Sequence, residues 1–254
     1  MNKHESSKID NVPLFMKKTS WYYPLTFPSN LLTYDMQLFT VGNPKTEKGE
    51  SLGYQTHILH LAPADASGYE VCPGRSPECT MYCLNTAGRG RFDRTQNARI
   101  RKTVEFFLNR DKFLADMVKD IDAGIRLAGR RSLIPVFRPN GTSDVRWELY
   151  GIMQKYPHLQ FYDYTKLSNR KNLPTNYHLT FSLSEDNLDK ALEAFDNGMN
   201  VAAVFNVVPD EYLGREVIDG DEHDLRFLDK KNVWVGLKAK GEAKKADNGF
   251  VIHV

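Results

Sequence analysis

Short apolar runs alternate with amphipathic helical patterns along most of the chain, and this alternation constrains the fold more than any other feature. Continuous apolar runs are typical of strands that are buried on both faces, as in a parallel sheet. Apolar residues that recur every three or four positions predict helices between these strands. We expect strands at residues 54–62, 132–138, 160–165, 177–183, 200–208 and 232–237, and helices over 95–128 with a division at an N-cap Asp111, from about 145, and over 187–197.

About six strand–helix units predict an α/β fold, and we expect a partial (β/α)6 TIM-like barrel. The barrel domain is expected over residues 51–254, after an N-terminal arm and packing segment over residues 1–50. The polar stretch 42–51 predicts a solvated turn, and the acidic stretch 209–232 predicts a solvated loop. Residues 250–252 predict a short edge strand.

The composition of the 254 residues is that of a globular protein, with 41% hydrophobic and 26% charged residues. A net charge of +2 gives no electrostatic argument for a nucleic-acid or membrane partner. No apolar run approaches the roughly 20 residues that cross a bilayer, and the polar residues 1–10 do not resemble a signal peptide. We therefore expect a cytoplasmic protein, in which thiols stay reduced.

All three cysteines of the chain lie in one stretch of twelve residues, with the spacing C-x6-C-x3-C. Cys72, Cys79 and Cys83 are too close in sequence to pair well as disulfides, and an odd number leaves one over. Pro73, Gly74 and Pro77 predict a tight turn that lets neighbouring thiolates converge. This pattern predicts a metal centre.

Thiolates select zinc or iron–sulfur clusters. Structural zinc usually takes C-x2-C pairs and a fourth ligand, which here would have to be a distant histidine such as His57 or His60. A 4Fe–4S cluster is held by cysteines, and three of them leave one iron open for a small molecule. We favour the cluster, with zinc and unligated thiols as the alternatives. His57 and His60 are three residues apart on an expected strand, so we predict that they point to opposite faces and pack.

Polar residues follow the expected strands, at the ends that gather on one face of a barrel. They include the cysteines, residues 140–144, Lys166, residues 182–185, Asn206 and Lys238. This convergence predicts a binding site around the cysteines. The basic, glycine-rich stretch 85–91 predicts either an anion contact or a surface turn. Glu222 and His223 form a second metal candidate, for which a solvated loop is the alternative.

The cysteine stretch, which follows the first expected strand and has Tyr82 directly before Cys83, resembles the radical-SAM superfamily. That superfamily has a partial (β/α)6 barrel and the spacing C-x3-C-x2-C, from which this chain departs in both gaps. The resemblance implies a 4Fe–4S cluster that binds S-adenosylmethionine (SAM). It suggests residues that would hold SAM and residues that would hold a substrate anion; these are Asn140, Thr142, Ser143, Ser182 and Glu185 for SAM, and Lys166 or Lys238 for the anion.

The chain resembles more closely a radical-SAM-like phage family named after mycobacteriophage gene product eighty-eight. The matching residues are the cysteine stretch, the runs 96–99 and 102–103, and 140–144 followed by Trp147 and Glu148. The resemblance implies a phage protein of the host cytoplasm with an iron–sulfur cluster and a small-molecule ligand at the open iron. We expect an iron–sulfur protein on this fold and leave open whether it is a radical-SAM-type enzyme. The alternatives are an iron–sulfur redox, sensor or ligand-binding protein without SAM chemistry, and a structural zinc module that contacts nucleic acid.

Overall fold

The computed structural model describes residues 36–83 and 88–254. These belong to a compact unit that spans residues Tyr34–Val254. The predicted arm and the aromatic part of the packing segment, up to residue 34, lie outside the described residues, as do residues 85–87 of the predicted glycine-rich stretch 85–91. The predicted division of the chain at residue 51 stays a prediction.

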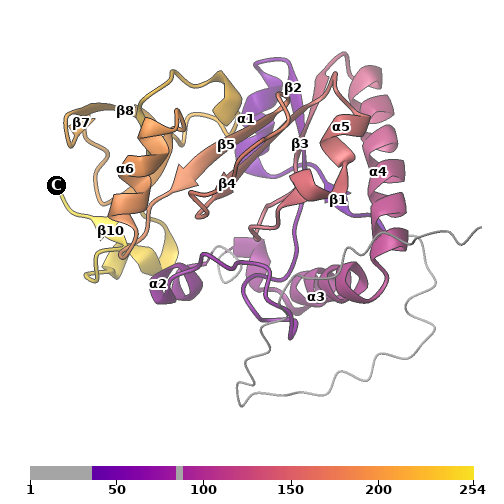
Figure 1. Cartoon of the computed structure of the whole chain (residues 1–254), viewed down its shortest axis with the longest axis horizontal. Coiled ribbons are helices and arrows are strands. Elements are labelled where there is room, and N and C mark those ends of the chain that lie inside the picture. Colours follow the sequence, from indigo (N-terminus) through magenta and orange to yellow (C-terminus); the bar gives the residue numbers. More distant parts are fainter. Residues whose placement is uncertain (1–35, 84–87) are drawn as a thin grey trace, which may run out of the picture. The chain divides into compact units, whose positions relative to one another are not determined.

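One ten-stranded sheet organises this unit (Figure 1). Its strands lie in the order β1-β2-β3-β4-β5-β6-β9-β8-β7, with β10 added against β6. The strands are β1 (Phe39–Thr40), β2 (Tyr54–Leu59), β3 (Ile134–Arg138), β4 (Gln160–Thr165), β5 (Tyr177–Ser182), β6 (Val201–Phe205), β7 (Glu211–Tyr212), β8 (Arg215–Asp219), β9 (Trp234–Lys238) and β10 (Val251–Ile252). The bounds of β4 match the prediction, and the other predicted strands are present but shorter.

The predicted α/β class is confirmed: the fold is a mixed α/β sheet that is not closed into a barrel. Strands β2, β3, β4, β5, β6 and β9 are parallel neighbours in chain order, as predicted for successive strand–helix units. The sheet differs from a closed barrel at the two ends of this row of six strands. Strand β1 pairs antiparallel with β2, and β8 pairs parallel with β9 and carries β7 at its other edge. The hydrogen-bonding edges that would meet in a closed barrel are therefore occupied by other strands.

Strand β10 fills a gap that opens between β5 and β6. Strand β5 pairs with the first half of β6, from Val201, whereas β10 pairs with its second half, where Val251 lies opposite Val204. The predicted short edge strand is thus present, as a parallel strand that pairs with β6. Together, β5 and β10 complete the pairing along one side of β6.

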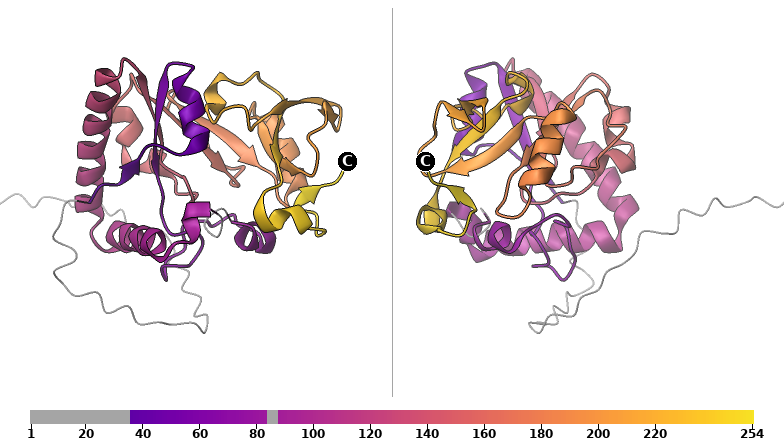
Figure 2. Two further views of the ribbon diagram at one scale, coloured as in Figure 1. Left: turned by 180° about the vertical axis from the view of Figure 1, so that it is seen from behind. Right: turned by 60° about the vertical axis from the view of Figure 1, so that its left-hand side comes forward.

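Helices cover one face of the sheet (Figure 2). They are α4 (Arg110–Arg130), which packs on β3, the short α5 (Ile152–Lys155), and α6 (Leu188–Asp196), which packs on β5 and β6. Gly124 of α4 lies against His57, whose ring stacks on Phe137 at a centroid distance of 4.9 Å. His57 is therefore a packing residue, as predicted. Gly198 follows α6 with φ +79°, the left-handed conformation expected after a helix end.

The long predicted helical region is two helices, α3 (Asp93–Leu108) and α4, and the break lies at Asn109. Asn109 has φ −132° and ψ 55°, which cannot continue an α-helix. The break therefore falls two residues before the predicted N-cap Asp111, which lies in the first turn of α4. The helix expected from residue 145 is a 3-10 turn, η4 (Trp147–Tyr150), followed by α5.

The opposite face of the sheet is covered by two segments that were predicted as turn and loop. The predicted turn contains α1 (Pro44–Glu50), in which Gly49 lies against Leu225. The acidic loop contains β7, β8 and the 3-10 turn η5 (Arg226–Leu228). Leu225 packs with Val136 and Tyr162 in a separate small core. Apolar residues on both sides of the sheet thus bury it, except near the carboxyl ends of the strands.

Candidate functional site

The cysteine stretch lies at the carboxyl end of β2, beside α3 (Figure 1). Ala62, just after β2, donates its N–H to Thr103 Oγ1 of α3 at 2.9 Å, which ties the strand end to that helix. The chain then turns at Cys72, whose carbonyl accepts from Arg75 N at 3.0 Å. The short helix α2 (Pro77–Met81) follows, with Cys79 within it and Cys83 just beyond its end.

Ser76 and Pro77 explain why a helix begins here. Ser76 Oγ accepts from Cys79 N at 3.1 Å, and Pro77 occupies the first helical position, where its missing N–H costs nothing. The N-cap therefore fixes the backbone of Cys79 directly.

Cys72 is partly buried in this arrangement, and its thiol makes two hydrogen bonds. Its Sγ accepts from Ala64 N at 3.3 Å and donates to the carbonyl of Thr142 at 3.7 Å. Burial, and to a lesser degree the neighbouring Cys83, raise the pKa of Cys72 to about 12. A cation at this position would reverse that effect, because thiolates bind metals only after losing the proton.

The three cysteines are not joined by a disulfide. Within residues 36–83 and 88–254, no group of three or more His, Cys, Asp or Glu side chains is arranged to hold a metal ion. The donor chemistry of three thiols on one turn fits an iron–sulfur cluster, and Cys72 lies within electrostatic range of Cys83. A cluster would require the loop to draw the three thiols closer together. The same search gives no support to the pair Glu222 and His223, and the His223 ring accepts from Leu225 N at 3.2 Å.

Helix α2 is anchored to the rest of the protein from two sides. Glu185, after β5, accepts from Ser76 Oγ at 2.8 Å and from Glu78 N at 3.1 Å. On the other side, Asn248 donates to Glu78 and to Tyr82 Oη, and the Tyr82 ring lies 5.3 Å from that of Phe250. Both carboxylate oxygens of Glu185, a predicted SAM contact, therefore accept hydrogen bonds from the cysteine loop.

Lys166 and Ser182 also lie beside this loop. Lys166 Nζ donates to Ser182 Oγ at 2.8 Å, across the ends of β4 and β5. A Cβ added to Gly74 would lie 3.0 Å from Lys166 Cβ, so glycine is needed for the turn to approach β4 this closely. Lys238, at the end of β9, is exposed, and its backbone N–H donates to Asp221 at 3.2 Å.

The loop 140–144 is held by an internal hydrogen-bond network. Asn140 Oδ1 accepts from Ser143 Oγ, Val145 N and Trp147 Nε1, and its Nδ2 donates to Val145 O and Asp163. Thr142 Oγ1 donates to Leu61 O at 2.6 Å. Asn140, Thr142 and Ser143 thus shape the loop beside Cys72, and their predicted contact with SAM stays a prediction.

A buried charged network lies beneath that loop. Arg170 pairs with Glu148 and Asp144, and Asp144 also accepts from Lys166 N at 2.8 Å. Asp163 accepts from Asn140 N at 2.7 Å and from Tyr177 Oη at 2.7 Å. Burial raises the pKa of Asp163 to about 7, although these hydrogen bonds and nearby cations oppose the rise. The network therefore holds the loop 140–144 in place.

Four polar residues that share one face of the strands were not among the site residues predicted from the sequence. His60, Arg138, Tyr164 and Thr180 follow or lie on β2, β3, β4 and β5. A signal existed, because polar residues at alternate positions of otherwise apolar strands share one face.

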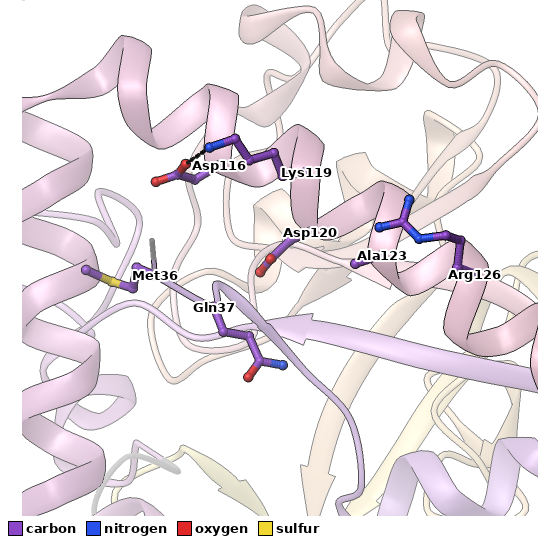
Figure 3. Close-up of a pocket in the computed structure, with 7 residues that line it drawn as sticks. All are labelled: Met36, Gln37, Asp116, Lys119, Asp120, Ala123 and Arg126. Atoms are coloured by element: carbon purple, nitrogen blue, oxygen red, sulfur yellow. Dashed lines mark hydrogen bonds and ion pairs between the residues drawn. The ribbon is translucent and has the colours of Figure 1, made fainter. Parts of the chain in front are cut away.

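A separate hollow of about 370 Å³ lies on α4, where Gln37 and Met36 approach Asp116, Asp120 and Arg126 (Figure 3). Asp116 is paired there with Lys119 at 3.1 Å. None of the predicted site residues lines this hollow.

The fold and site define an α/β protein whose cysteine loop and polar residues gather at the carboxyl edge of a mainly parallel sheet. The chain belongs to a family of phage gene products, Gene product 88, whose family model matches residues 37–254. No curated protein and no solved structure matches the chain. Among the helices of the described residues, none is long and apolar enough to cross a membrane.

Proposed function

We propose that the chain is an iron–sulfur protein of the phage-infected host's cytoplasm, in which Cys72, Cys79 and Cys83 hold a 4Fe–4S cluster with one open iron. The observation that carries this proposal is that all three cysteines lie within residues 72–83, in the connection after β2, with Cys79 on the capped helix α2 and Cys72 and Cys83 on either side of it. Ligands of α/β proteins bind at this edge of the sheet.

The surroundings of the loop support a resident cofactor. Glu185 and Asn248 hold α2 from opposite sides, and Gly74 lets the turn lie directly against β4. Burial lowers the pKa of Arg99, while Cys83 acts on it in the opposite direction, so the two groups interact. A guanidinium beside a thiolate favours the charged form that a ligand to iron must take.

We further propose that the protein is a radical-SAM-type enzyme on a partial barrel. The chain-order row of six parallel strands from β2 to β9 supports this relationship. When bound, such a cluster would hold the methionine part of SAM at the open iron and supply the electron that cleaves it. Ser182 and Lys166 lie beside the loop and would contact a bound small molecule, whereas Lys238 would meet one only at the rim.

A second function is favoured by one specific observation. The Asn140 and Glu185 side chains make hydrogen bonds within the protein, so their positions are accounted for without a contact to SAM. An iron–sulfur redox, sensor or ligand-binding protein would need the thiols but not these contacts.

Anaerobic purification followed by iron and sulfide analysis tests the cluster, and electron paramagnetic resonance with and without SAM separates the two functions. About four irons and four sulfides per chain are expected in the wild type, and far fewer in Cys72→Ser and Cys83→Ser. Ser67→Ala, in the same connection but outside the cysteine stretch, is the matched control. A spectrum that changes with SAM supports the enzyme, and an unchanged one supports the second function. Zinc without sulfide would refute both and support a zinc module.

A further inference from the structure

Four polar atoms near the cysteine loop are buried without a hydrogen-bond partner among the described residues. They are His60 Nδ1, Arg138 Nε, Tyr164 Oη and Thr180 Oγ1. More than nine in ten buried polar groups in proteins are paired, because an unpaired one loses the hydrogen bonds it made to water. Four such atoms on neighbouring strands indicate a partner that the protein itself does not provide.

These residues share one face of the sheet. Arg138 lies opposite Ile58 in the pairing of β2 with β3, and Tyr164 lies opposite Thr180 in the pairing of β4 with β5. The Arg138 guanidinium lies 4.8 Å from the centre of the Tyr164 ring. We call His60, Arg138, Tyr164 and Thr180 the polar strand face.

Gly141 sets the position of His60 within this face. A Cβ at residue 141 would lie 2.5 Å from His60 Nδ1 and 2.6 Å from Ile58 Cγ2, closer than side chains tolerate. Only glycine therefore lets the loop after β3 pass over the imidazole. The His60, Arg138 and Tyr164 side chains are partly exposed, and Thr180 is fully buried beside Tyr164.

The polar strand face offers donors to a ligand, in a positive field. The Arg138 Nε–H can only donate, and the hydroxyls of Tyr164 and Thr180 have no acceptor in the described chain. Burial and the cations Arg99, Arg138 and Lys102 lower the pKa of His60 to about 3, against a weaker opposite effect of Asp224. Asp224 pairs with Arg138 at 2.9 Å, so this carboxylate offsets part of the positive charge around His60. Oxygen atoms of an anion match both the donors and the field.

We propose that the polar strand face binds the anionic group of a small molecule, a phosphate or a carboxylate, which enters from the side of the cysteine loop. This inference deepens the proposed function, since it names the chemical class of the ligand beside the cysteines. It differs from the expected anion contacts, because Lys166 is already bonded to Ser182 and Lys238 lies at the rim.

The test is a calorimetric titration of the full chain, in chloride buffer, with inorganic phosphate and separately with succinate. At least one of the two is expected to bind and to raise the Tm, and the one that binds identifies the anion. Tyr164→Phe and Thr180→Val each remove one unpaired hydroxyl at nearly constant shape. We expect each to weaken binding about tenfold, while the ligand-free Tm is unchanged or higher because an unpaired buried group has been removed. Tyr212→Phe, on β7, is the matched control and should bind as the wild type does.

Two results would overturn the inference: no binding of either anion, or binding that is equally tight in Tyr164→Phe and Thr180→Val. The titration is made on protein as purified and again after chelator treatment, with iron measured in both. Anion binding to iron-free protein would stand even if the cluster proposal failed, and an iron–sulfur protein that binds neither anion would retain the first proposal and lose this one.

Discussion

Removing the Glu185 carboxylate is predicted to release the cysteine helix α2. Glu185 accepts two hydrogen bonds, from Ser76 Oγ and Glu78 N, and the residues are partly buried. Hydrogen bonds to a charged group contribute roughly 1.5–3 kcal/mol each when buried, so we take about 2 kcal/mol for both together after discounting for solvent. Glu185→Ala should therefore increase the opening of α2 about 30-fold.

Amide hydrogen exchange measures this opening directly. Exchange in a peptide that covers residues 72–83 should accelerate about 30-fold in Glu185→Ala, while peptides from α4 remain unchanged. Glu185→Gln keeps an acceptor oxygen and should show a smaller effect, and Glu193→Ala, an exposed glutamate on α6, is the control. Exchange within twofold of the wild type in Glu185→Ala would refute the assignment of Glu185 as the anchor of the loop, and would return it to the candidate ligand contacts.

Two further predictions concern the buried Asp163 carboxyl group and the packing of Gly141 against His60. Burial raises the pKa of Asp163 to about 7, above its unfolded value, so the folded state holds a proton that the unfolded state has lost; stability should fall by about 4 kcal/mol as the pH rises from 4 to 7. Urea denaturation at several pH values should show this component in the wild type and lose it in Asp163→Asn, and identical profiles would contradict the assignment. Gly141→Ala should destabilise the protein by about 1–3 kcal/mol through its clash with His60. Gly129→Ala, in α4 with open space around it, should be neutral or stabilising in the same assay, and equal effects of the two changes would contradict the packing argument.

The sequence predicted the strands well because their apolar runs are continuous. Residues 160–165 form β4 with the predicted bounds. The parallel order of the six main strands was also predicted, although no α-helix lies between β4 and β5 or between β6 and β9. The turn before α2 was predicted from Pro73 and Gly74, whereas Pro77 begins the helix.

The predictions missed a helix that a local cap begins and a loop that distant contacts bury. Helix α1 has a polar sequence and begins because Asn43 Oδ1 accepts from Thr46 N at 3.1 Å. The acidic loop looked solvated, yet Leu225 within it is fully buried against β3 and β4. Closure of a barrel could not be judged, because it depends on which strands occupy the two edges.

In the candidate site, the sequence named the cysteines and polar residues around them, and what these residues bind stays a prediction. Glu185 and Ser76 are 109 residues apart, so no local pattern could show that one caps the other. Asn140 was recognised as important, but its contacts with Trp147 and Asp163 are internal. The iron–sulfur cluster and SAM stay predictions.

The contact of Asn248 with Glu78 spans 170 residues, and it imposes an order of events during synthesis. The ribosome synthesises the cysteine stretch early. It releases the second anchor, formed by Asn248, Phe250 and β10, only after nearly all of the sheet has been translated. For that interval α2 lacks one of its two anchors, and the cysteines are exposed to oxidants and to free metal ions. Loading of a cofactor before the last strand inserts beside β6 would meet a looser loop than loading afterwards.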